Sequence, residues 1–247
     1  MPAWTIVVLA AVALCAGTVD AIAGGGGLIT VPALRLAGVP VHLALGTNKG
    51  QSTWGSLAAS ITFWRAGRVD RRLARVTFPL ACAGSFAGAS LQLQVPRALL
   101  DPIVIALLVV AAIVIVVRKP VRAADAPAVR TWVAGLLALA IGAYDGFFGP
   151  GTGTFLIVGF VALCGRSLVH ASADAKVVNF AANATALATF AHAGTVMWQV
   201  ALPMAVGQLC GGILGTRLAL RGGARIVRFA VVAVSVALIA KLGWDLI

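Results

Sequence analysis

Long apolar stretches alternate with short polar connections along the whole chain. Most of the stretches reach the roughly 20 residues that a helix needs to cross about 30 Å of hydrocarbon. Two of them, residues 28–40 and 153–165, would cover only about 20 Å, and both directly follow a glycine cluster. The pattern predicts an all-α integral membrane protein, a polytopic helical bundle with two short, broken half-helices. The predicted segments are 3–22, 28–40, 43–64, 73–94, 99–117, 130–147, 153–165, 169–191, 198–217 and 226–244.

The same succession of landmarks occurs in both halves of the chain. The matching positions are Lys49 and Lys176, Gly67 and Gly194, Gly84 and Gly211, and Gly88 and Gly215, each 127 apart (176 − 49), with Asp20 and Asp145 125 apart (145 − 20). A duplicated half with a broken helix in each copy is typical of secondary transporters. We therefore expect transmembrane repeats at residues 1–117 and 131–247, joined by a cytoplasmic linker, residues 118–130.

The distribution of arginine predicts how the repeats lie in the membrane. Arginines fill the connections at 65–75, 118–130 and 217–228, whereas 146–152 and 192–197 contain no Lys or Arg. Placing the rich connections in the cytoplasm requires ten segments, five per half, so the second copy is inverted. A competing layout makes the two short runs re-entrant, with eight crossings and parallel halves. We favour ten segments, because otherwise the arginine clusters would lie on both faces.

Composition excludes several other classes of protein. Hydrophobic residues make up 61% of the chain and charged residues only 11%, against about 25% in soluble domains, and mean hydropathy is +1.02. The net charge of +12 does not indicate nucleic-acid binding, because base-reading motifs and stacking aromatics are missing. Four isolated cysteines predict neither a disulfide framework nor a zinc site, and no metal or cofactor is expected. Residues 3–19 lack the basic start of a signal peptide and are expected to form a transmembrane helix.

The two glycine clusters are the first candidate binding elements. A broken helix persists in hydrocarbon only where it lines a protein-buried or watery cavity. The freed amides at the start of a half-helix carry partial positive charge and bind anions. Tight helix packing would be a purely structural reason for such glycines. The candidate residues are Gly25, Gly26 and Gly27 in the first copy, and Gly151, Thr152 and Gly153 in the second.

Two lysines within apolar segments form the second set of candidates. A charge in the bilayer costs at least about 2.5–3.5 kcal/mol, so it marks a functional site by default. Each lysine shares a helix face with polar residues at i+3 and i+7, although each could instead extend towards the membrane interface. The candidate set is Lys49, Ser52 and Ser56 with the neighbouring Asn48, and Lys176, Asn179 and Asn183.

Three aspartates could couple transport to protons. Asp20 and Asp145 each precede a glycine cluster, and Asp174 lies two residues before Lys176, with which it could pair or exchange a proton. Each could instead be a simple counter-ion to a nearby lysine.

The segments DAIAGGGGLITVP, ALGTNKG and GFFGPGTGTFL resemble the TauE/SafE sulfite exporter family of bacterial membrane proteins, over nearly the whole chain. The resemblance implies a permease for sulfite, sulfoacetate or related sulfur and organic anions. Members are usually described with seven to nine helices, so ten segments departs from that pattern. The first copy has Thr47-Asn48 where the second has Asp174-Ala175, so the two half-sites are not expected to be chemically equal.

These observations together predict a multi-pass secondary transporter in the inner (plasma) membrane that exports a small anion using the proton gradient. The anion would lie between the half-helix starts, neutralised by both lysines, and one half would rock against the other. The lipid bilayer and the anion are the expected partners. An enzyme is not expected, because HExxH, GxSxG and paired Glu are missing. The sequence is also compatible with a permease for another organic anion or a transition-metal cation, and with a passive channel.

Overall fold

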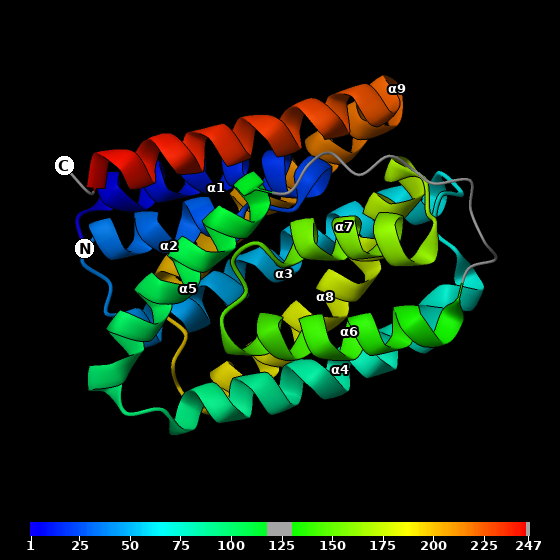
Figure 1. The fold of residues 1–247 in the computed structure, drawn as a ribbon. Helices are drawn as coiled ribbons and strands as arrows, with labels where there is room; N and C mark the ends of the chain where they lie inside the picture. Colours follow the sequence, from blue (N-terminus) through cyan, green and yellow to red (C-terminus); the bar gives the residue numbers. More distant parts are fainter. Residues whose placement is uncertain (118–129, 246–247) are drawn as a thin grey trace.

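The computed structural model describes residues 1–117 and 130–245, except for the side chains of residues 112, 114–117 and 223–245. Within these ranges the regular structure is entirely α-helical (Figure 1). The helices are α1 (Ala3–Ala23), α2 (Gly27–Leu36), α3 (Val41–Arg65), α4 (Arg71–Gln94), α5 (Arg97–Val117), α6 (Thr131–Phe147), α7 (Thr152–Cys164), α8 (Leu168–His192) and α9 (Trp198–Asp245). The predicted all-α fold class is confirmed.

The two short helices lie where the sequence predicts them. Helix α2 has 10 residues and α7 has 13, and each begins directly after a glycine cluster. The predicted segments 198–217 and 226–244 both belong to α9, whose ribbon doubles back where its colour passes from orange to red (Figure 1). Most of the predicted linker, residues 118–129, lies outside the described residues.

Helices from the two halves of the sequence are interleaved. Helix α1 packs along α9, α4 packs along α6, and α3 and α8 lie against α9 and α4 respectively (Figure 1). We call α1, α2, α3 and α9 the first body, and α4, α6, α7 and α8 the second body. Because α4 and α9 occupy equivalent places in the two repeats, each body contains one helix exchanged from the other half.

Glycines explain why these particular helices pair. A Cβ at Gly84 or Gly88 would collide with the backbone of α6, and one at Gly211 or Gly215 with the backbone of α1. The facing residues are Leu139 and Ala143 in α6, and Leu14 and Thr18 in α1, which are again 125 positions apart (139 − 14 and 143 − 18). Small residues at i and i+4 allow such close backbone approach between membrane helices. The sequence repeat is therefore also a repeat of contacts.

The central helices α3 and α8 run antiparallel where they touch. Ser52 bonds to Asn183, whereas Ser60, further along α3, bonds to the carbonyl of Lys176, which lies earlier in α8. Since α3 and α8 are equivalent in the repeat, this is the relation that inverted copies would have. The orientation of the halves across the membrane remains a prediction.

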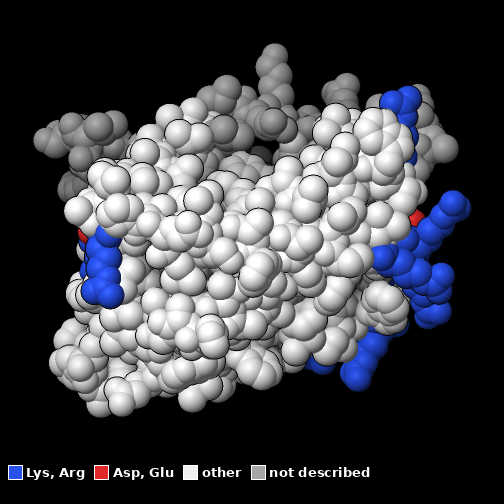
Figure 2. Space-filling view, turned by 90° about the horizontal axis from the view of Figure 1, so that it is seen from below, with Lys and Arg blue, Asp and Glu red and all other residues white. Residues whose placement is uncertain are grey.

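The outer surface suits a membrane. Figure 2 shows charged side chains at the two ends of the visible face and a broad uncharged band between them. Large apolar side chains are exposed around the bundle, among them Trp4, Phe86 and Val206. Within the described residues, α1 and α4 are by length and composition able to cross a membrane. Helices α3 and α8 carry the polar residues of the candidate site, which lowers their hydropathy.

Candidate functional site

The two glycine breaks touch each other at the interface between the two bodies. Helix α1 ends at Ala23 and is followed by Gly24, whose φ of +82° favours glycine; any Cβ at Gly24 would collide with Gly153. The Thr154 N–H donates to the Gly24 carbonyl (3.1 Å), and the Thr154 hydroxyl donates to the Ala23 carbonyl (2.8 Å). The breaks from the two halves thus form a single site.

Both lysines are paired with an aspartate from the opposite half of the sequence. Lys49 Nζ lies 2.7 Å from Asp145 Oδ2, and Lys176 Nζ lies 2.8 Å from Asp20 Oδ2. The lysine side chains are 1% and 0% exposed, so neither extends to the membrane interface. Each pair joins one helix of the first body to one of the second: α3 to α6, and α1 to α8.

The carboxylate of Asp20 occupies the environment that the sequence predicts for a bound anion. Its Oδ2 accepts from Lys176, while its Oδ1 accepts from the backbone N–H of Gly26 (3.1 Å), the N-cap of α2. A half-helix start and a buried lysine therefore already hold one carboxylate between them.

The two polar stripes predicted on α3 and α8 interlock. The side-chain oxygen of Asn183 accepts from Lys49 Nζ (3.1 Å) and from the hydroxyl of Ser52 (3.0 Å). The side-chain amide of Asn183 in turn donates to the backbone carbonyl of Asn179 (2.9 Å) and to its side-chain oxygen. Ser56 instead donates to backbone carbonyls of its own helix.

Two further residues orient Asn48. Its side-chain oxygen accepts from the Thr30 hydroxyl (2.6 Å) and from Gln51 Nε2 (2.8 Å), which fixes the orientation of the side-chain amide. Thr30 and Gln51 are both fully buried, and sequence reasoning missed them. Comparison of the copies at the offset of 127 could have found them, because the equivalent positions hold the apolar residues Ile157 and Val178.

These groups surround a small polar cavity with about 20 Å³ of free space, enough for roughly one water molecule. Eleven of the sequence-predicted residues line it: Asp20, Gly26, Gly27, Asn48, Lys49, Ser52, Asp145, Gly151, Gly153, Asn179 and Asn183. Gly24, Gly149 and Gln208 line it as well and were not predicted. Five predicted residues are not part of the lining: Gly25, Ser56, Thr152, Asp174 and Lys176. Of these, Lys176 acts on the site through Asp20.

Asp174 lies apart from this cavity. Its carboxylate accepts from Arg166 (2.8 Å), rather than from Lys176, and from the backbone N–H of Asp70 (2.9 Å). The equivalent residue, Thr47, accepts from the backbone N–H of Met197 (3.0 Å). Both acceptors and both donors are 127 positions apart (174 − 47 and 197 − 70), so the two unlike side chains hold equivalent loops. The cavity is asymmetric in several positions: Asn48 stands against Ala175 and Ser52 against Asn179, and Asn183 lines the cavity whereas its counterpart Ser56 does not.

The charged groups of the site form two pairs of opposite charge. Among the described residues, no group of three or more His, Cys, Asp and Glu side chains could hold a metal ion. Buried, mutually neutralised charges at broken helices in an apolar bundle are features of membrane transporters, and this protein is a membrane transporter. The chain belongs to the sulfite exporter TauE/SafE family, whose model matches residues 9–242. The resemblance carried by the glycine motifs is thereby confirmed.

Several curated relatives carry related names. The "Probable membrane transporter protein ORF9" of Sinorhizobium sp is 39% identical over 232 residues, covering 93% of this chain and 89% of the relative. The "Probable membrane transporter protein YfcA" of Escherichia coli K12 is 37% identical over 241 residues, covering 96% and 89%. The names indicate a transporter rather than an enzyme. No solved structure matches the chain significantly.

Proposed function

We propose that this protein is a multi-pass, inner-membrane secondary transporter of small oxyanions such as sulfite or sulfonates, coupled to protons. The observation that carries the proposal is the position of the Asp20 carboxylate, between Lys176 and the Gly26 amide. A substrate oxyanion can make the same two interactions once that carboxylate withdraws. The family's printed description, sulfite exporter, supports this choice of substrate class.

Charge balance supports proton coupling. The two lysines and their two aspartates sum to zero, and an added anion would leave an uncompensated buried charge, which is strongly unfavourable. Protonation of Asp20 or Asp145 releases its lysine to bind the anion and keeps the site neutral. The proton then moves in the same direction as the anion. Export would then run against an inward proton gradient and would be driven by a high internal concentration of the anion, so in this proposal the anion gradient replaces the proton gradient as the expected driving force.

The two lysine–aspartate pairs also link anion binding to the opening of the site. Both ion pairs and the Gly24–Thr154 contact cross the interface between the two bodies. A relative movement of the bodies would widen the small cavity, and rebinding of the aspartates to the lysines would allow the empty site to narrow again. We propose that these two bodies, rather than the two halves of the sequence, alternate.

Transport from proteoliposomes loaded with sulfite and a pH-sensitive dye tests the proposal. The variant Lys49→Met with Asp145→Asn removes both charges of one pair, which avoids an unpaired buried charge. We expect it to fold and to lose sulfite efflux by about tenfold or more, since hydrogen bonds to charged groups contribute about 1.5–3 kcal/mol. The control is Arg35→Gln with Asp101→Asn, which removes an exposed ion pair (38% and 47% exposed).

Wild-type efflux in the Lys49→Met, Asp145→Asn variant would refute the site. Release of sulfite without any accompanying proton from the wild-type protein would refute the coupling while leaving the binding site intact.

A further inference from the structure

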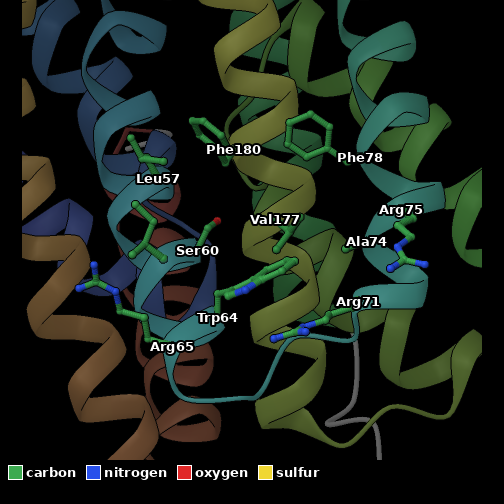
Figure 3. A pocket seen from close by; sticks show the side chains of 11 residues that line it. Leu57, Ser60, Trp64, Arg65, Arg71, Ala74, Arg75, Phe78, Val177 and Phe180 are labelled. Carbon is green, nitrogen blue, oxygen red and sulfur yellow. The ribbon is translucent and has the colours of Figure 1, made fainter.

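A second, much larger hollow lies between α3, α4 and α8, at the arginine-rich end of the bundle (Figure 3). Its volume is about 600 Å³. The residues lining it are Leu57, Ser60, Ile61, Trp64 and Arg65 from α3, Arg71, Ala74, Arg75 and Phe78 from α4, and Val177 and Phe180 from α8. None of these residues belongs to the central cavity.

The walls of this lateral hollow are apolar and its end is cationic. Leu57, Val177 and Phe180 line the deeper part, and Phe78 lies beside them (Figure 3). At the end of the helices the Arg71 guanidinium lies 5.7 Å from the centre of the Trp64 ring, a cation–π contact. Arg75, which also lines the hollow, follows one turn later on α4 with its guanidinium turned away from Trp64, and Arg65 points to the other side of α3 (Figure 3).

The hollow opens towards lipid rather than towards the substrate site. Ile61, Trp64 and Phe78, which line the hollow, are 43%, 44% and 38% exposed, so the hollow opens at the outer surface of the bundle. Its inner edge is Ser60, whose hydroxyl donates to the Lys176 carbonyl (2.7 Å).

The second repeat has no counterpart of this arrangement. At the offset of 127, Arg71 and Arg75 correspond to Trp198 and Leu202 (198 − 71 and 202 − 75), and Ser60 corresponds to Leu187 (187 − 60). Leu187 packs into a hydrophobic cluster with Phe190, Val196 and Ala201. The hollow and its cations are therefore not needed to build the repeat, which indicates a role of their own.

We propose that the lateral hollow binds an anionic phospholipid. An acyl chain would lie along the apolar wall, and the phosphate would contact Arg71, with Arg75 reaching it by rotation of its long side chain, since arginine binds phosphate through charge-assisted hydrogen bonds. The positive-inside rule assigns this end to the cytoplasmic leaflet, where anionic lipids attract basic groups beside membrane helices. The apolar wall has no use for a free soluble anion, and the arginines have less attraction for a zwitterionic lipid.

Native mass spectrometry and thermal stability of the full chain in neutral detergent test this site. We expect phosphatidylglycerol to remain bound and to raise the melting temperature more than phosphatidylcholine with the same acyl chains. The variant Arg71→Gln with Arg75→Gln should lose that difference. The matched control is Arg68→Gln with Arg72→Gln, which changes the net charge equally at exposed arginines outside the hollow.

A second variant, Ala74→Leu, leaves the charges in place and fills part of the hollow beside its apolar wall. This variant should also weaken retention of phosphatidylglycerol. Three results would overturn the proposal: equal loss of binding in the Arg68, Arg72 control, equal stabilisation by phosphatidylcholine, or full stabilisation by inorganic phosphate alone. The last result would mean that the cations bind a free anion. None of these results depends on the transported substrate.

Discussion

A buried lysine is tolerated here because each one has a carboxylate within hydrogen-bonding distance. Removing one member of such a pair leaves a buried charge, whose cost is commonly about 3–5 kcal/mol. Protonation neutralises the carboxylate of Asp20 or Asp145 and leaves the shape of the side chain nearly unchanged. Each aspartate is therefore both a counter-ion and a candidate proton carrier, two roles between which the sequence did not decide.

Replacement of Asp20 by Asn tests this dual role. Asn keeps an oxygen that can accept from the Gly26 N–H, but its charge cannot change. The site then has a permanent excess positive charge, so we expect tighter sulfite binding, retained sulfite exchange and loss of the accompanying proton movement. Simultaneous sulfite and pH recordings in proteoliposomes measure this, with Asp101→Asn, at an exposed ion pair, as the control. Proton movement that is unchanged in Asp20→Asn would contradict the assignment.

The orientation of Asn48 can be tested separately. Thr30→Val removes the hydroxyl that donates to the Asn48 side-chain oxygen and keeps the side-chain volume nearly constant. Since a hydrogen bond contributes about 1 kcal/mol, we expect the KM for the anion to rise about fivefold. Thr77→Val is the control, because Thr77 is equally buried but donates to a backbone carbonyl of α4. Equal transport by both variants would show that the Thr30 hydroxyl does not orient Asn48 for anion binding.

Single residues were predicted from sequence where a charge or a repeated polar position made them conspicuous. Lys49, Lys176 and Asn183 fall in this class. Lys49 and Asn183 line the cavity, and Lys176 binds Asp20, which also lines it. Thr30 and Gln51 were missed because a polar residue inside an apolar run does not reveal which side chain it holds. The pairing of each lysine with the aspartate of the other half also could not be predicted, because it is a contact between residues far apart in the sequence.

Among the elements, the glycine faces of α4 and α9 determine how the helices pair. Gly88→Ala and Gly215→Ala each place a methyl group against the backbone of the facing helix. Such overpacking costs about 1–3 kcal/mol, so both variants should melt several degrees lower in a detergent thermal-shift assay. Gly159→Ala should have a smaller effect, because its neighbours are the movable ends of the Leu137 side chain. A clearly unequal response of Gly88 and Gly215 would argue against equivalent packing.

Helix boundaries followed from hydropathy to within a few residues for α3, α4 and α6. The packing partners of these helices did not follow from the sequence. A face of small residues shows that a helix packs closely but does not show which helix it packs against. The sequence therefore predicted the short half-helices α2 and α7 but not the pairing of α1 with α9, nor that of α4 with α6.

At the scale of the whole molecule, the ten-segment layout predicts on which side of the membrane each connection lies. With ten segments and the arginine-rich connections in the cytoplasm, reporters fused after residue 124 and after residue 194 should lie on opposite sides of the membrane. Alkaline phosphatase and a fluorescent protein, each fused at both positions, measure this. Both fusions reporting the same side would rule out the ten-segment layout and its inverted repeat.

The exchange of α4 and α9 between the bodies also constrains how the protein is made. A chain entering the membrane from its N-terminus inserts α1 well before α9, yet the glycine face that α1 packs against belongs to α9. The second body can assemble once α8 has emerged, because α4, α6, α7 and α8 are all present by then. The first body stays incomplete until synthesis reaches α9. In a newly made chain, α1 is therefore present before the helix that covers it, and until α9 is made the contact face of α1 lacks that partner.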